Sequence, residues 1–319
     1  MASQNMQYRS LGRSGTKVSV FGLGGWTTFG GSVTDEQMVQ TIITAAFEAG
    51  INFFDIADVY AKGESERAMG RVLKGFPRSE LVISSKLFWP MSDDPNDRGL
   101  SRKHIMESVE KSLKRIGTDY LDIYFCHRFD TETSVEETVR AMDDLVHQGK
   151  VLYWGTSEWT GEQLRQAQVV ADRRNLYLPQ VEQPQYNLLA RAKFEKDVAP
   201  TCHDLGMGVV VWSPLASGVL TGKYDNGVPP NSRLARIDWL REGLLTAEKT
   251  EKVRAFGQIA SRLGVSRTQL ALAWVAANPV VSSVILGATR LEQLQENLGA
   301  MQVQIPETVK AEIEALFPA

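Results

Sequence analysis

Eight short apolar segments alternate with helix-forming segments along nearly the whole chain. The apolar segments are β-prone, and each runs into polar or turn residues before the next helical pattern begins. They span residues 20–24, 51–55, 81–86, 121–127, 151–156, 180–183, 208–212 and 283–287. Strands separated by helices form parallel sheets, and eight such units without a dividing linker favour closure. The sequence therefore predicts an α/β fold, a (β/α)8 TIM barrel, rather than an open sheet.

The helix ends carry recognisable signals. Five pairs have the spacing of a capping box, in which a hydroxyl and a later side chain each bind a backbone amide of the first turn. These are Thr34 with Gln37, Ser134 with Glu137, Thr160 with Gln163, Ser266 with Gln269 and Thr289 with Glu292. Six glycines stand where helices should end: Gly50, Gly117, Gly149, Gly206, Gly264 and Gly299. Apolar residues between these signals recur at helical spacing and are expected in the core.

Three further features complete the predicted architecture. Residues 8–20 hold two strand candidates around a glycine-rich turn, which predicts an N-terminal β-hairpin closing the bottom of the barrel. Residues 88–100 and 214–245 are long connections after strands, so both are expected over the catalytic face. No proline- or serine-rich linker divides the chain, so residues 1–319 are expected to form a single domain.

Composition excludes several classes of protein. Hydrophobic residues make up 43% and charged residues 23%, typical of a globular protein. No apolar run is long enough to span a bilayer, and Met1–Asn5 lack a signal pattern, so a cytoplasmic protein is expected. A net charge of −3 gives no general attraction for nucleic acid. The two cysteines, Cys126 and Cys202, and four histidines show no metal-ligand spacing, so no metal is expected.

The common nucleotide-binding and hydrolase motifs are missing. Gly22–Thr27 begins like a dinucleotide fingerprint, but Thr27 stands where the last glycine belongs. Gly12–Lys17 does not have the spacing of a phosphate-binding loop, and no Gly-x-Ser-x-Gly motif occurs. A Rossmann domain, a nucleotide hydrolase and an α/β-hydrolase are therefore disfavoured.

The ends of the predicted strands carry an unusual set of side chains. Successive strands end at Asp55, with Tyr60 close behind it, then at Lys86 and at His127. The next three end near Ser157, Gln183 and Trp212. A parallel barrel brings these positions to one face. Taken singly, Asp55 could be a helix cap, Tyr60 a rim residue, Gln183 a satisfied amide and Trp212 part of the core.

Together, the first four side chains suit carbonyl reduction. A tyrosine is protonated at neutral pH and can act as a general acid if a cation eases loss of its proton. Lys86 would be that cation, and Asp55 would keep it charged and oriented. His127 would donate a hydrogen bond to the substrate oxygen. Tyr60 would then protonate the oxygen while hydride reaches the carbon.

Several motifs resemble one enzyme family. The pair Asp55 and Tyr60, Ser85-Lys86, and Cys126-His127-Arg128 look like the catalytic tetrad of the aldo-keto reductase superfamily. Six motifs resemble its branch that contains the β subunits of voltage-gated potassium channels and their plant and microbial relatives, over about residues 6–317. They are residues 22–30, 86–89, 99–104, 135–142, 154–159 and 212–215. Animal channel subunits tend to carry asparagine where this chain has His127, which favours catalysis here.

The resemblance implies a cofactor, NADP(H), and assigns residues to it. Trp212 would stack on the nicotinamide, with Ser157, Glu158 and Gln183 beside its carboxamide. Three groups complete the expected site: Gly25 and Trp26 after the first strand; Ser213, Pro214, Leu215, Ser217, Gly218, Lys223 and Arg233 along the pyrophosphate; and Gly287, Thr289, Arg290, Gln293, Glu296 and Asn297 around the adenosine.

Local physics supports the adenosine end of this assignment. Thr289 is expected to cap a helix, whose first amides attract phosphate. Arg290, helped by Lys223 or Arg233, would favour a 2′-phosphate and hence NADP over NAD. Alone, each of these three cations would more often be a solvated surface charge.

The leading functional prediction is an NADP-dependent oxidoreductase that reduces aldehydes or ketones. Trp26, Phe88 and Trp89 are expected to bind a flat or apolar carbonyl substrate, although each could simply pack beneath the long loop. Two alternatives remain at this level. Lys86 could form a Schiff base in an aldolase-like barrel. The resemblance also allows a cofactor-sensing β subunit of a potassium channel, a homo-oligomer such as a tetramer with a membrane channel as its partner.

Overall fold

Eight parallel strands close into a barrel in the computed structural model, which describes residues 6–230 and 232–319. The strands follow one another around the barrel in chain order, and the last pairs with the first. They are β3 Phe21–Gly24, β4 Phe53–Asp55, β5 Val82–Leu87, β6 Leu121–Cys126, β7 Val151–Ser157, β8 Val181–Gln183, β9 Gly208–Val211 and β10 Ser283–Leu286. The predicted (β/α)8 TIM barrel is confirmed. The signal-peptide argument from Met1–Asn5 falls outside the described residues.

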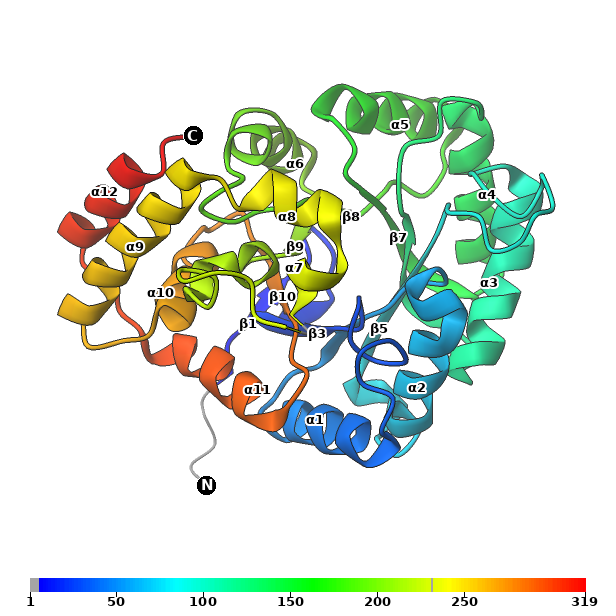
Figure 1. The fold of residues 1–319 in the computed structure, drawn as a ribbon. Helices are drawn as coiled ribbons and strands as arrows, with labels where there is room; N and C mark the ends of the chain where they lie inside the picture. The colour runs from blue at the N-terminus through cyan, green and yellow to red at the C-terminus, as the bar shows by residue number, and fades with distance from the viewer. Residues whose placement is uncertain (1–5, 231) are drawn as a thin grey trace.

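Helices surround the barrel as an outer layer (Figure 1). They are α1 Glu36–Glu48, α2 Glu64–Leu73, α3 Arg102–Ile116, α4 Val135–His147, α5 Gly161–Arg174, α6 Ala199–Leu205, α9 Ala247–Arg262, α10 Arg267–Ala276, α11 Leu291–Leu298 and α12 Glu307–Leu316. Their buried faces pack inward, as the apolar periodicity of the sequence predicts, and α12 packs on α9. Within the described ranges, no helix is both long and apolar enough to cross a membrane.

The strand register sets the height of each site residue. Asp55 lies opposite Gly24 on one side and Ser84 on the other. Ser157, at the end of β7, pairs with Gln183, at the end of β8. Because all eight strands run the same way, their carboxyl ends form one rim, where active sites of this fold lie.

The predicted N-terminal hairpin is also present. Its strands, β1 Tyr8–Ser10 and β2 Lys17–Ser19, pair antiparallel. Leu11 and Val18 are fully buried and share a core cluster with barrel-interior side chains. The amide of Arg13 donates to the carbonyl of Gly206, just before β9 begins, at 2.9 Å. The hairpin therefore covers the end of the barrel opposite the catalytic rim.

Two helix starts differ from the predicted ones. The side chain of Asp35, not Thr34, accepts the first-turn amide of α1, from Met38 at 2.7 Å. α11 begins after Arg290 with no side-chain cap, so Thr289 is not its cap. Gln293 instead accepts hydrogen bonds from both the amide and the hydroxyl of Thr289, at 2.8 and 3.0 Å. Thr289 thus pairs with Gln293, four residues later, instead of forming the predicted capping box with Glu292, three residues later.

The other three predicted capping boxes are present in full or in part. Thr160 with Gln163 and Ser266 with Gln269 form complete capping boxes. Ser134 caps α4, but the carboxylate of Glu137 accepts from the amide of Arg102 on α3 instead of closing the box. Five of the six glycines have the left-handed backbone of a helix end. The exception is Gly299, which is right-handed because the chain continues into the 3₁₀ turn η5, Gly299–Gln302.

Both long connections leave the catalytic rim, as expected. The segment after β9 contains the 3₁₀ turn η4 Ala216–Thr221 and two short helices, α7 Arg233–Arg236 and α8 Asp238–Leu244, that the sequence did not predict. Figure 1 shows α7 and α8 in front of the barrel opening, and residues of both line the cleft there. The segment after β5 brings Trp89 to the same cleft. Shorter turns are η1 Tyr60–Gly63, η2 Arg78–Glu80 and the π turn η3 Phe194–Val198.

Candidate active site

A fully buried lysine links two other ionisable side chains at the rim. Nζ of Lys86, near the end of β5, donates to Oδ2 of Asp55 at 2.6 Å and to the hydroxyl of Tyr60 at 3.1 Å. It also donates to the carbonyl of Ile56 at 2.7 Å. These three acceptors match the three donors of an ammonium group. Side chains predicted from two separate stretches of sequence, Asp55 with Tyr60 and Lys86, therefore meet around one nitrogen.

Asp55 is held from the other side as well. Its Oδ1 accepts from Oγ of Ser84 at 2.8 Å and from Nε2 of Gln183 at 2.9 Å. Ser84 comes from the neighbouring strand β5, and Gln183 reaches across the barrel from β8. A buried carboxylate that accepts from this many donors is fixed in direction. Asp55 can therefore orient Lys86.

The two partners of this network have shifted protonation equilibria. Burial raises the pKa of Tyr60 well above its ordinary value, and the Asp55 carboxylate raises it further. Burial lowers the pKa of Lys86, while the charge of Asp55 and its hydrogen bond oppose that shift. Tyr60 is consequently a phenol at neutral pH, next to an ammonium that would stabilise the phenolate left after proton donation.

The loop after β4 aims Tyr60 at Lys86 through an unusual backbone. Ala61 and Lys62 both adopt left-handed conformations, with φ of 49° and 54°. Such conformations cost energy in residues other than glycine and are concentrated at functional sites. The amide of Asp58 donates to the carbonyl of Lys86 at 3.2 Å, which ties this loop to β5.

His127 completes the group just beyond β6. Its ring lies edge-on to that of Tyr60, with centroids 5.7 Å apart. Burial lowers the pKa of His127 well below its ordinary value, and the positive charges of Lys86 and Arg128 lower it further. A neutral imidazole carries one N–H donor. Its buried Nδ1 has no hydrogen-bond partner among the described residues.

These residues open into one large cleft of about 1240 Å³. It runs from Tyr60 and His127 past Trp212 to the start of α11. Of the predicted cofactor and substrate residues, most line it: Trp26, Trp89, Ser157, Gln183, Trp212, Ser213, Pro214, Leu215, Ser217, Gly218, Lys223, Arg233, Gly287, Thr289, Arg290, Gln293, Glu296 and Asn297. The described residues contain no group of His, Cys, Asp or Glu side chains placed to hold a metal.

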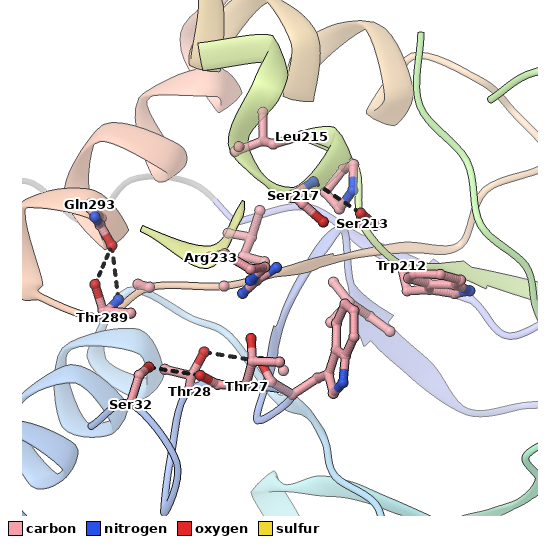
Figure 2. A pocket seen from close by; sticks show the side chains of 18 of the residues that line it. Thr27, Thr28, Ser32, Trp212, Ser213, Leu215, Ser217, Arg233, Thr289 and Gln293 are labelled. Carbon is pink, nitrogen blue, oxygen red and sulfur yellow. Dashed lines mark hydrogen bonds between the residues drawn. The ribbon is translucent and has the colours of Figure 1, made fainter. Parts of the chain in front are cut away.

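Aromatic rings define the middle of the cleft. Trp26 and Trp212 meet edge to face, with centroids 5.8 Å apart. The guanidinium carbon of Arg233 lies 5.2 Å from the centre of the Trp26 ring. Figure 2 shows the side chain of Arg233 between the Ser213–Ser217 turn and the loop of Thr27 and Thr28. Arg233 therefore lies in the middle of the cleft, between Trp212 and the segment of Thr289 and Gln293 (Figure 2).

The turn after β9 presents its backbone to the cleft. Ser213, Ala216 and Ser217 have left-handed φ values of 56°, 48° and 57°, and Gly218 has 91°. The carbonyl of Ser213 accepts from Nδ2 of Asn187 at 2.9 Å. Successive turns of this kind can point amide groups into a concavity that attracts anions. Lys223 extends next to Gly218, where an added Cβ would come within 2.7 Å of its Nζ.

The opposite wall is built from the end of β10 and the start of α11. Gly287 lines the cleft, and a Cβ built on it would meet no protein atom within 4 Å. A side chain at Gly287 would therefore project into the open cleft. Arg290 is exposed, and its closest carboxylate contact is a loose one to Glu292 at 3.8 Å.

Four predicted site residues do not line the cleft. Lys86 lies behind Tyr60 and contacts its hydroxyl. Gly25 is packed against Ser65, where an added Cβ would come within 2.3 Å of Oγ. Phe88 stacks edge-on against Trp89, with centroids 5.1 Å apart.

Glu158 is the fourth of these residues, and it lies behind Trp212. Its carboxylate accepts from Nε1 of Trp212 at 3.0 Å and binds Nζ of Lys193 at 2.8 Å. Burial alone would raise the pKa of Glu158, but the Lys193 contact holds it below the ordinary value. Glu158 therefore positions the indole of Trp212 from behind rather than facing the cleft.

Sequence reasoning missed several lining residues. They include Thr27, Thr28, Ser32, Arg128, Arg236 and Trp239. Arg128 directly follows His127 at a strand end, so its position could have been inferred from the same pattern. The others come from loops, or from the short helices α7 and α8 within a long connection, whose path over the barrel leaves no periodic signal in the sequence. Trp239 belongs to α8, is 69% exposed and lies at the mouth of the cleft.

A parallel eight-stranded barrel with Asp, Tyr, Lys and His at its carboxyl rim defines a class of oxidoreductase. Residues 20–317 match the model of the aldo/keto reductase family, and the chain belongs to that family.

Its relatives include proteins named as potassium-channel subunits. A probable voltage-gated potassium channel subunit beta from Oryza sativa is 49% identical over 303 residues, covering 93% of this chain and 92% of its own. The protein of the same name from Arabidopsis thaliana is 48% identical over the same shares. A putative subunit beta from Schizosaccharomyces pombe is 45% identical over 94% of this chain and 89% of its own.

Proposed function

We propose that the protein is an NADPH-dependent reductase of aldehydes and ketones. The observation that carries this proposal is the contact of Lys86 Nζ with both Asp55 and the hydroxyl of Tyr60 at a cleft that also holds His127. Family membership supports oxidoreductase chemistry in general. Each residue then has one task in protonating a carbonyl oxygen.

Tyr60 is proposed as the general acid. Its raised pKa keeps the phenol protonated, and its hydroxyl lies 3.1 Å from a cation that stabilises the phenolate formed after transfer. Lys86 remains charged because Asp55 is 2.6 Å away. His127 is proposed to donate its single N–H to the same oxygen, which orients the carbonyl and polarises it. A neutral imidazole suits this role because it is not competing as an acid.

The cleft suits a nicotinamide dinucleotide. The open space above Gly287, the inward-curved backbone at 213–218 and the face of Trp212 together form a long cradle with cationic side chains. When bound, the reduced nicotinamide supplies a hydride to the carbonyl carbon. Trp212 would hold the ring, and the turn at Ser217 and Gly218 with Lys223 would hold the pyrophosphate.

Preference for NADP over NAD is proposed to rest on Arg290. Because α11 has no side-chain cap, its first amides remain open to an anion. Arg290 stands at that end, 64% exposed, with only the loose contact to Glu292. The guanidinium fork matches the geometry of a phosphate. Arg233 is engaged over Trp26 and is left out of this role.

A titration of tryptophan fluorescence tests the cofactor assignment. NADPH should quench the emission of Trp212, and NADH should bind much more weakly. A Trp212→Phe variant is the matched control, because it should lose most of the quenching while still binding NADPH in a calorimetric titration. Absence of NADPH binding by both methods would refute the proposal.

A Schiff-base lysine is disfavoured by the same geometry. Lys86 donates to three acceptors, which leaves an ammonium without the lone pair that attack on a carbonyl requires. Borohydride trapping of a substrate adduct on Lys86 would reverse this conclusion.

A second candidate function is a cofactor-sensing channel subunit. The three relatives carry potassium-channel names, and on that basis we propose that this chain assembles as a homo-oligomer and binds the cytoplasmic part of a membrane channel. Gentle co-purification from membranes, with NADPH present or removed, tests the partner, and light scattering tests the oligomer. If the protein is a monomer and no channel peptides co-purify with it, the channel-subunit proposal is refuted. The reductase proposal does not depend on that result.

Two smaller expectations go with these proposals. A cytoplasmic location suits a cofactor kept reduced by metabolism, and fractionation of cells tests it. One cooperative unfolding transition, followed by circular dichroism and by fluorescence, is expected if residues 1–319 form one domain.

A further inference from the structure

Arg128 brings a positive charge to the substrate end of the cleft. It follows His127 at the end of β6, is half-buried and lines the same cleft as Tyr60. Its Nη1 donates to the carbonyl of His127, and its guanidinium carbon lies 5.6 Å from the centre of the Trp89 ring. Two contacts thus hold the side chain in place, and its other N–H donors have no partner among the described residues.

This charge has no acidic partner in the described ranges. No carboxylate there lies within ion-pair distance of the Arg128 guanidinium, and its one hydrogen bond is to a backbone carbonyl. The carboxylates that line the cleft are Asp55, which is paired with Lys86, and Glu296, which belongs to α11. Around the reacting groups the cleft therefore carries a net positive charge. Keeping a half-buried guanidinium unpaired is costly unless a ligand supplies the anion.

The place of Arg128 separates it from the proposed phosphate sites. In the closed barrel, β6 and β10 are four strands apart, so they lie on opposite sides of the eight-stranded ring. Arg290 and Gly287 follow β10, whereas Arg128 follows β6. The dinucleotide's phosphates would lie along the β9 and β10 side. Arg128 is left facing the substrate, on the side of His127 and Trp89.

We infer that Arg128 selects carbonyl substrates that carry a carboxylate, so that the reductase acts best on small aldehyde or keto acids. This inference rests on the proposed function. The substrate's carbonyl oxygen would lie between Tyr60 and His127, and its carboxylate would meet the guanidinium fork in the paired geometry that arginine favours. Trp89 would cover the carbon skeleton between the two groups. The product is the corresponding hydroxy acid.

The test uses three positional isomers of carboxybenzaldehyde and their neutral methyl esters. For each pair, kcat/KM with NADPH is measured for the wild type, Arg128→Met and Arg128→Lys. At least one acid should exceed its ester by about tenfold or more in the wild type. Arg128→Met should bring that ratio close to one, and Arg128→Lys should leave it at an intermediate value. A purely structural role for Arg128 would lower acid and ester together and leave the ratio unchanged, which would overturn the inference.

Two controls separate the possible failures. Arg98→Met removes the same charge from the exposed loop before α3 without touching the cleft, so its acid-to-ester ratio should equal that of the wild type. Unsubstituted benzaldehyde reports the reductase activity itself. If benzaldehyde and all esters are not reduced, the proposed function fails. If they are reduced but no acid is preferred, only the role of Arg128 fails.

Discussion

The buried pair of Asp55 and Lys86 should be strongly coupled in stability as well as in function. Nζ and Oδ2 are 2.6 Å apart, with side chains 0% and 4% exposed. At that separation, with an effective dielectric constant of about 20, the attraction is roughly 6 kcal/mol before desolvation is counted. Replacing Lys86 with methionine leaves a buried carboxylate held only by Ser84 and Gln183. Breaking a buried pair in this way costs about 3–5 kcal/mol of unfolding free energy.

A double-mutant cycle measures this coupling. Urea unfolding is followed for Lys86→Met, Asp55→Asn and the double variant, which buries no net charge at this point. The double variant should be more stable than the sum of the two single losses predicts, by about 2 kcal/mol or more. All three should lose reductase activity, because none keeps an ammonium oriented beside Tyr60. Additive losses within about 0.5 kcal/mol would refute the reasoning, since they would mean that the two charges do not interact.

Three other predictions follow from single residues. Tyr60→Phe should lower kcat by about 10²–10⁴-fold, while its Kd for NADPH stays within about threefold of the wild-type value. A Tyr60→Phe variant with wild-type kcat would exclude Tyr60 as the acid. Arg290→Ala should weaken NADPH binding about tenfold or more in calorimetry and leave NADH unchanged; equal losses for both would contradict a 2′-phosphate role. Burial raises the pKa of Glu182 to about 8, so the folded protein keeps a proton on this carboxyl that the unfolded chain releases above about pH 4. Unfolding therefore releases a proton between these two values, and the free energy of unfolding falls as the pH rises toward 8. Relative to Glu182→Gln, the wild type should lose about 1.4 kcal/mol per pH unit between about pH 5 and 7, and a pH-independent difference in urea unfolding would show that Glu182 is ionised in the fold.

The barrel and the group of Asp55, Tyr60, Lys86 and His127 could be predicted because their signals are local. Each strand is a short apolar run that ends in a polar residue, and the fold itself gathers strand ends at one rim. The geometry that joins them, such as the bond from Gln183 to Asp55 across the barrel, spans 128 residues. No sequence pattern within a single strand or helix predicts a contact over that separation.

Other contacts could not be predicted because distant parts of the chain decide them. Glu158 was expected beside the cofactor, but Lys193 and Trp212 hold its carboxylate behind the indole. The predicted role of Arg233 near a phosphate stays a prediction, and no sequence pattern indicated its contact with the Trp26 ring. Even a local motif was decided by competition, since Gln293, four residues after Thr289, accepts its hydrogen bonds in place of Glu292, three residues after it. The paths of the loops and the choice between competing hydrogen-bond partners therefore could not be predicted from the sequence.

The most direct test of the account follows the hydride itself. NADPH carrying deuterium at the transferred position of its nicotinamide is incubated with the protein and benzaldehyde, and the alcohol is examined by mass spectrometry. The account predicts benzyl alcohol with one deuterium on the carbinol carbon, and almost none from the Tyr60→Phe variant under the same conditions. Alcohol without deuterium, or equal labelled product from Tyr60→Phe, would contradict hydride transfer to a carbonyl protonated by Tyr60.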